Sequence, residues 1–122
     1  MVERNKMTII QSDILKNWIA TVFETCGFSA QNAQLSAQVL VDADLRGIDS
    51  HGVARVSGYV RLIKNGRINP KPNFIVTHRK KTMIHVDADG AIGLLSAPFA
   101  MNLTIEATAE YGSGWAGISN SN

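Results

Sequence analysis

The spacing of apolar residues along this chain changes at two closely spaced prolines, Pro70 and Pro72. Before them, apolar residues recur every three or four positions, the period of a helix that buries one face. After them, apolar and polar residues alternate, the period of a half-buried strand. Because proline ends a helix, the two patterns belong to different parts of the fold. The sequence predicts an α+β protein in which three N-terminal helices precede a small, largely antiparallel sheet with one helix.

Three helices are expected before the prolines, over residues 12–26, 29–46 and 51–64. Ser29 is a good N-cap for the second helix, and Gly47 ends it because glycine adopts the left-handed conformation without penalty. Small residues such as Ala33 and Ala37 let another helix approach closely. The residues predicted to face inward from the first two helices are Ile14, Leu15, Trp18, Ile19, Val22, Phe23, Cys26, Ala33, Ala37, Leu40 and Val41.

After the prolines we expect strands at 73–78 and 82–87, a helix at 96–110 and a strand at 115–119. The first two strands form a hairpin with basic residues 79–81 at a solvated tip, and Asp89-Gly90 makes a turn. Pro98 fits because it falls in the first turn of the expected helix. The last strand has no predicted partner, which is typical of a truncated domain. We therefore divide the chain into a helical segment, 1–68, and an incomplete second unit, 69–122.

Composition excludes several functional classes. Twelve Lys and Arg against ten Asp and Glu give a net charge of +2, and the basic residues are too scattered for a nucleic-acid surface. The single cysteine, Cys26, excludes an internal disulfide and fits a reducing cytoplasm. The polar opening run at 1–6 lacks the apolar core of a signal peptide. Polar residues interrupt the apolar stretch 91–109, so no membrane span is expected.

The stretch from Asp44 to Tyr59 carries the candidate site. If Ser50 caps a helix that begins at His51, then His51, Arg55 and Tyr59 follow at four-residue intervals along one side. The apolar residues of the same helix, Val53, Val56, Val60 and Ile63, point in nearly the opposite direction, towards the core. Gly58 leaves room in front of the imidazole and the guanidinium for a small anion. The alternative interpretation is an ordinary solvated helix face.

Two carboxylates, Asp42 and Asp44, lie near the end of the second helix, where the helix dipole disfavours negative charge. Either could be compensated by an ion pair with Arg46 or Arg55. A carboxylate here could instead hold His51 in one tautomer. We favour the ion pair.

Other motifs do not point to a site. The glycines of residues 112–117 match the letters of a dinucleotide-binding fingerprint, but they follow a predicted helix and enter a strand. The fingerprint requires the reverse order, so we interpret them as a helix stop and a tight turn, and the fold as not Rossmann. His78 and His85 lack the further ligands of a metal site, and no metal is expected.

The segment Gly-Ile-Asp-Ser-His-Gly-Val-Ala-Arg at 47–55 resembles the type 2 malate/L-lactate dehydrogenase family. The resemblance continues through Tyr-Val-Arg-Leu at 59–62, Gly-Arg-Ile-Asn-Pro-Lys-Pro at 66–72 and Gly-Trp-Ala-Gly-Ile-Ser-Asn-Ser-Asn at 114–122. The matching blocks occur in the right order and cover nearly the whole chain. Family members are much longer, so this chain resembles their N-terminal portion.

The resemblance implies an NAD- or NADP-dependent, homodimeric oxidoreductase without a Rossmann domain, acting on a small 2-hydroxy or 2-oxo acid such as malate or lactate. His51 then matches a proton donor or acceptor, Arg55 the carboxylate clamp and Ser50 a substrate hydrogen-bonding group, with Tyr59 a lining residue. Most cofactor contacts would lie beyond Asn122, in the cofactor-binding domain that 69–122 begins. The competing hypothesis is a non-catalytic helical association module, or an inactive fragment, that needs a partner chain.

Overall fold

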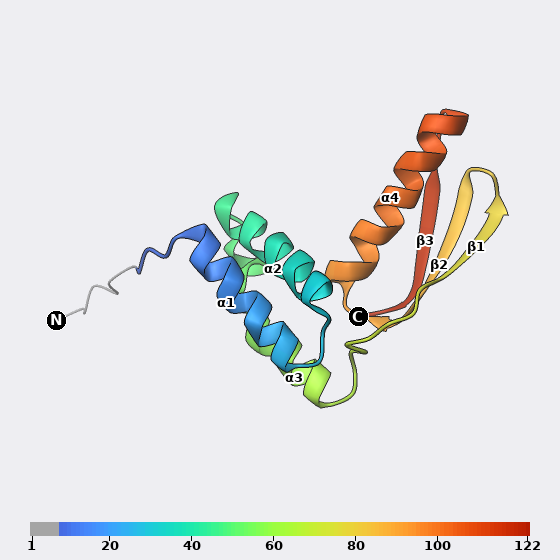
Figure 1. Ribbon diagram of the computed structural model, residues 1–122. Coiled ribbons are helices and arrows are strands. Elements are labelled where there is room, and N and C mark those ends of the chain that lie inside the picture. The colour runs from blue at the N-terminus through green and yellow to red at the C-terminus, as the bar shows by residue number, and fades with distance from the viewer. Residues whose placement is uncertain (1–7) are drawn as a thin grey trace.

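The computed structural model describes residues 8–122, and the polar run at 1–6 lies outside them. The elements are α1 (Ser12–Thr25), α2 (Ala30–Leu45), two 3-10 turns η1 (Asp49–His51) and η2 (Val53–Arg55), α3 (Val56–Lys64), β1 (Ile75–Lys80), β2 (Met83–Ala91), α4 (Gly93–Tyr111) and β3 (Trp115–Ser121). In Figure 1 the first three helices gather at one end, and α4 lies along the sheet at the other. The predicted α+β class is confirmed.

The helical end is built around α1 and α2. The Ser29 side chain accepts a hydrogen bond from the Asn32 N–H and caps α2, as predicted. Phe23 of α1 and Leu40 of α2 are fully buried, and so is Ala33 at the close approach of the two helices. No helix among residues 8–122 has the length and apolar character needed to cross a bilayer.

The core prediction for α1 is partly wrong. Ile19 and Phe23 are completely buried, but Ile14 and Trp18 are 59% and 55% exposed. The predicted apolar residues wrap around more than one face of α1, and the neighbouring helices cover only one face of it. An apolar surface therefore remains open on this helix.

The sheet is mixed, with strand order β1-β2-β3. The antiparallel hairpin of β1 and β2 is confirmed, and Val76 pairs with Val86. β3 runs parallel to β2, with Ala116 opposite Ile84, so the last strand does have a partner, contrary to expectation. The buried side chains Ile84 and Val86 pack beneath α4 with Ala100 and Ala107.

Three local predictions in this half need correction. β2 continues through Asp89 and Gly90, whose positive φ values of 51° and 74° form an irregularity inside the strand where a turn was expected. The hairpin tip lies after Lys80, later than the three basic residues suggested. α4 begins at Gly93, so Pro98 falls in its second turn, where it has no N–H for the carbonyl of Leu94.

The glycines of residues 112–117 end α4 and turn the chain into β3, as predicted. Gly112 adopts the left-handed conformation, with φ of 82°. A Cβ at Gly114 would lie 2.6 Å from the carbonyl oxygen of Thr104, so only glycine fits this turn. The glycines thus serve the packing of β3 against α4.

Candidate active site

The site segment begins where α2 ends. The Gly47 N–H donates to the carbonyl of Asp44, and the Ile48 N–H donates to that of Ala43. With Gly47 at a φ of 73°, this pair of bonds is a Schellman motif, so the predicted role of Gly47 is confirmed.

The predicted helix start at His51 is wrong. Residues 49–51 and 53–55 form two short 3-10 turns, and the α-helix begins only at Val56. Between the turns, Gly52 leaves the helical conformation, with φ −98° and ψ −142°. Ser50 therefore lies inside the first turn instead of capping a helix, and His51 and Arg55 do not share an α-helical face.

Ser50 brings His51 and Arg55 together in another way. Its Oγ lies 2.8 Å from Nδ1 of His51, within hydrogen-bonding distance. Its carbonyl oxygen accepts a 2.7 Å hydrogen bond from Nε of Arg55. All three residues are exposed, and residues 8–122 supply no other side-chain hydrogen bond to His51 or Arg55. The imidazole Nε2 and the outer end of the guanidinium are therefore free to meet a ligand.

Tyr59 belongs to a different environment. It is half-buried and packs against the core cluster with Val53, Val60 and Ile63, while Val56 is buried within it. The inward direction predicted for these valines is confirmed. A Cβ at Gly58 would meet nothing within 4 Å, so this part of α3 has open space around it.

Neither acidic residue at the end of α2 makes the expected ion pair. Asp42 accepts a 2.7 Å hydrogen bond from the Gln38 side chain, and Asp44 accepts one of 2.8 Å from the Val53 N–H. The tautomer of His51 is thus linked to the hydroxyl of Ser50 and not to a carboxylate. Within the described part of the chain, the one ion pair found joins Lys16 and Asp13.

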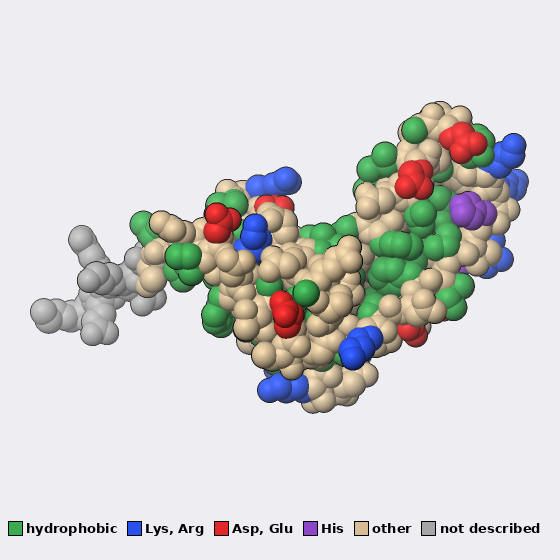
Figure 2. Space-filling view, in the orientation of Figure 1, with side chains coloured by type: hydrophobic (Ala, Val, Ile, Leu, Met, Phe, Trp, Pro, Cys, Tyr) green, Lys and Arg blue, Asp and Glu red, His purple; other side chains and the backbone are tan. Residues whose placement is uncertain are grey.

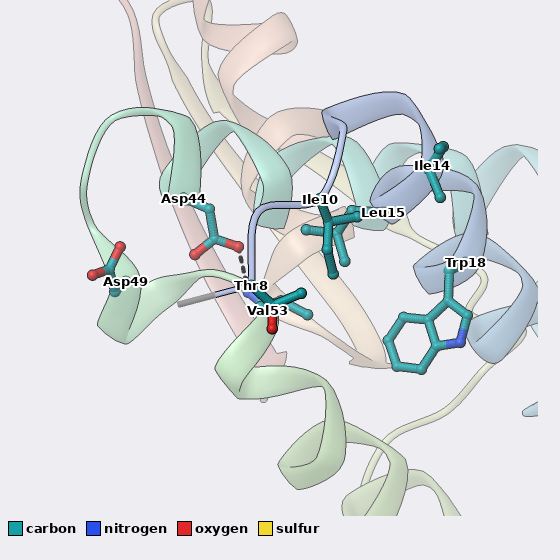
Figure 3. Close-up of a pocket in the computed structure, with 8 residues that line it drawn as sticks. All are labelled: Thr8, Ile10, Ile14, Leu15, Trp18, Asp44, Asp49 and Val53. Atoms are coloured by element: carbon teal, nitrogen blue, oxygen red, sulfur yellow. Dashed lines mark hydrogen bonds between the residues drawn. The ribbon is translucent and has the colours of Figure 1, made fainter. Parts of the chain in front are cut away.

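A groove of about 670 Å³ opens beside this turn, and the sequence analysis missed it. The residues lining it are Thr8, Ile10, Ile14, Leu15, Trp18, Asp44, Asp49 and Val53. In Figure 3, Ile14 and Trp18 of α1 stand on one side and the carboxylates of Asp44 and Asp49 on the other. The sequence does contain an indication of this groove, because the apolar residues of α1 form a stripe too wide to be buried on one face.

A second cleft, of about 430 Å³, lies between the hairpin and the end of α4. Its floor includes Ile84 and Leu103, and Figure 2 shows hydrophobic side chains gathered between α4 and the strands. Nζ of Lys81 lies 5.5 Å from the ring centre of Tyr111, so one basic residue of the hairpin packs on this rim.

Polar side chains also meet on β2 and β3. Nε2 of His85 lies 2.9 Å from Oγ of Ser119, and the Asn120 side chain donates to Asp87. The Asp89 N–H and the Asn120 amide together hold the pKa of Asp87 below its ordinary value. Within residues 8–122, no three His, Cys, Asp or Glu side chains are placed to bind a metal ion.

The fold and the turn together define a class: an α+β protein that presents an imidazole and a guanidinium from one exposed turn, a pairing suited to a small carboxylate ligand. The model of the malate/L-lactate dehydrogenase family matches residues 10–122, nearly the whole chain. The chain belongs to this family.

Individual relatives support the assignment. L-sulfolactate dehydrogenase from Methanocaldococcus jannaschii is 32% identical over 114 residues, and malate dehydrogenase from Pyrococcus abyssi is 34% identical over 113. These matches cover 93% of this chain but 33% and 31% of the two relatives, so the chain spans about a third of their length.

Solved structures agree. The malate dehydrogenase of Pyrococcus horikoshii superposes with a TM-score of 0.90 at 32% identity, covering 94% of this chain and 33% of that protein. The sulfolactate dehydrogenase of Methanocaldococcus jannaschii gives a TM-score of 0.91 at 32% identity, with the same coverage.

Proposed function

We propose that this chain supplies the substrate-binding and proton-transferring part of an NAD(P)-dependent dehydrogenase for a small 2-hydroxy or 2-oxo acid. The proposal rests on one observation: Ser50 contacts both side chains, through its hydroxyl to Nδ1 of His51 and through its carbonyl oxygen to Nε of Arg55. The malate, sulfolactate and hydroxycarboxylate dehydrogenases among the relatives support the substrate class. The proposal extends to a cytoplasmic homodimer of the complete protein.

The two side chains have separate tasks in this reaction. The guanidinium of Arg55 binds the substrate carboxylate and so orients the neighbouring carbon for reaction. The imidazole of His51 gives a proton to the carbonyl oxygen during reduction and takes it back during oxidation. The hydroxyl of Ser50 holds Nδ1, which leaves Nε2 to face the substrate. Tyr59 keeps a supporting role at most, since its ring packs against the core.

A nicotinamide cofactor, when bound, supplies or accepts the hydride. The glycines of 112–117 do not fit the pyrophosphate of a dinucleotide, because they lead out of a helix and into β3. We therefore assign the cofactor contacts to the part of the relatives' length that this chain does not span, and 69–122 to the start of the cofactor-binding domain. The constellation of Ser50, His51 and Arg55 suits NAD and NADP equally.

A chimera tests the proposal. This chain would replace the matching N-terminal part of the Methanocaldococcus jannaschii sulfolactate dehydrogenase, whose fold it shares at a TM-score of 0.91. Reduction of oxaloacetate, pyruvate and sulfopyruvate would be followed by the absorbance of NADH and NADPH. We expect His51→Ala to lower turnover by about 100-fold or more, and Arg55→Ala mainly to raise KM.

Arg61→Ala provides a matched control, because Arg61 is another exposed arginine, on α3. It should leave the kinetics unchanged. Parental kinetics in both the His51 and Arg55 variants would refute the proposed roles.

The apolar groove on α1 favours the second candidate function, an association module, because its exposed Ile14 and Trp18 suit a protein partner. Nitrogen-15 NMR of the 122-residue chain separates the two functions. Titration with oxamate, an unreactive 2-oxo acid analogue, should shift the Nε–H signal of Arg55 and leave that of Arg61 in place. An association module would show no such selective shift.

A further inference from the structure

Asp44 belongs to α2, yet its side chain reaches the turn that carries the candidate site. Its Oδ2 accepts a 2.8 Å hydrogen bond from the backbone N–H of Val53, nine positions later in the chain. Figure 3 shows this bond at the edge of the apolar groove. Val53 is the first residue of η2, and Gly52 before it has no side chain that could cap the turn. Asp44, which belongs to α2, therefore caps the start of η2 in the way that an N-cap residue caps its own helix.

Gly52 is required by this contact. A Cβ at Gly52 would lie 1.8 Å from Oδ1 of Asp44 and 2.1 Å from its Cγ, far inside any allowed separation. The space left for the carboxylate is therefore enough by itself to demand glycine at this position. The carboxylate of Asp44 and the bare backbone of Gly52 form one interlocked unit, which we call the Asp44–Gly52 latch.

Helix electrostatics favour the latch. Asp44 lies in the last turn of α2, where the partial negative charge of the helix end repels a carboxylate. The same carboxylate meets the start of η2, which leads without a break into α3 and carries the partial positive charge of a helix N-terminus. The charge that weakens α2 thus draws the start of the next helix towards it.

The latch lies between the two halves of the site. Ser50 and His51 precede Gly52, whereas Arg55 follows Val53 by two residues. The hydrogen bond from Arg55 to the Ser50 carbonyl closes this loop across the latch. Holding Val53 therefore holds the backbone on either side of it, from which the Ser50 carbonyl and the Arg55 side chain extend.

We propose that Asp44 is a positioning residue of the site: through the Val53 N–H and the space left by Gly52, it sets the relative placement of His51 and Arg55. Asp44 itself touches neither substrate nor cofactor in this scheme. The inference rests on the proposed function for its catalytic meaning, but its structural claim is tested without any activity.

The structural test uses nitrogen-15 NMR of the full 122-residue chain. Asp44→Ala should speed hydrogen exchange of the Val53 amide by about tenfold or more, since a bond to a charged acceptor is lost. It should also move the Arg55 Nε–H signal towards that of a free guanidinium. Asp44→Asn keeps an acceptor oxygen and should restore both signals in large part.

Asp42→Ala is the matched control, because Asp42 occupies the same end of α2 and its side chain, among residues 8–122, bonds to Gln38 and not to the turn. Its Val53 and Arg55 signals should equal those of the parent. Gly52→Ala, which displaces the carboxylate without removing it, provides a second variant if Asp44→Ala does not fold. Parental Val53 and Arg55 signals in the folded Asp44 or Gly52 variants would overturn the inference, as would equal changes in Asp42→Ala.

Kinetics in the chimera then separate this inference from the proposed function. Asp44→Ala should raise KM for the 2-oxo acid by about tenfold, with Asp44→Asn closer to the parent. If Arg55→Ala impairs the chimera but Asp44→Ala does not, the positioning role is refuted and the function stands. If Asp44→Ala alters the Arg55 signal while neither His51→Ala nor Arg55→Ala has a kinetic effect, the latch stands and the function is refuted.

Discussion

Gly52 and Gly58 have different surroundings, so an added methyl group should change the stability of the chain in opposite directions at the two positions. At Gly52 the methyl would lie 1.8 Å from the Asp44 carboxylate, so the carboxylate must move and lose the Val53 N–H. A hydrogen bond to a charged group contributes about 1.5–3 kcal/mol, and Gly52→Ala should cost about that much. At Gly58, inside α3, nothing lies within 4 Å. Gly58→Ala should therefore stabilise the chain by about 0.5–1 kcal/mol.

Urea unfolding followed by far-ultraviolet circular dichroism measures both changes. We expect the two variants to differ by about 2–4 kcal/mol in the free energy of unfolding. The two substitutions should also be non-additive: once Asp44→Ala has removed the carboxylate, Gly52→Ala should cost less than about 1 kcal/mol. An equal cost of Gly52→Ala in both backgrounds would show that the backbone, and not the carboxylate, requires glycine there.

Two further predictions concern other parts of the fold. The lowered pKa of Asp87 means that its carboxylate adds stability above the pKa of the unfolded chain, and this stability is lost as the pH falls through the lower, folded pKa. Asn120→Ala should therefore raise the pKa of Asp87 towards its ordinary value in a carbon-13 NMR titration, and an unchanged titration would contradict this. Ser29→Ala removes the cap of α2 and should cost about 1 kcal/mol in urea unfolding, whereas Ser12→Ala, where no side-chain cap exists, should cost less.

Local signals predicted most of the helical half. Ser29 and Gly47 fix the ends of α2 by bonds to residues three or four positions away, so the sequence alone contains the information. The hairpin of β1 and β2 is equally local. The predicted start of α3 was wrong, and there the Val53 N–H is bonded to a side chain in another helix, a contact that local sequence does not reveal. The parallel pairing of β3 with β2 escaped prediction for the same reason, since it spans the whole of α4.

The exposure of Ile14 and Trp18 illustrates a different limit. Helical spacing shows which residues lie on one side of α1, but not how much of that side its neighbours cover. Here the core cluster covers the stripe of α1 that holds Ile19 and Phe23. Ile14 and Trp18 lie outside that stripe and line the groove. Periodicity therefore predicted the helix correctly and its burial only in part.

In the proposed function, the bond between Arg55 and Ser50 would constrain how the substrate carboxylate meets Arg55. A guanidinium can grip a carboxylate along the edge formed by Nε and one terminal nitrogen, or end-on through both terminal nitrogens. The Nε–H of Arg55 is already given to the Ser50 carbonyl at 2.7 Å. A two-pronged grip is then left to the terminal pair, so the carboxylate approaches end-on. Ser50 also lies within hydrogen-bonding distance of Nδ1 of His51, so in the proposed function one residue would determine both the approach of the acid group and the imidazole nitrogen that remains for proton transfer.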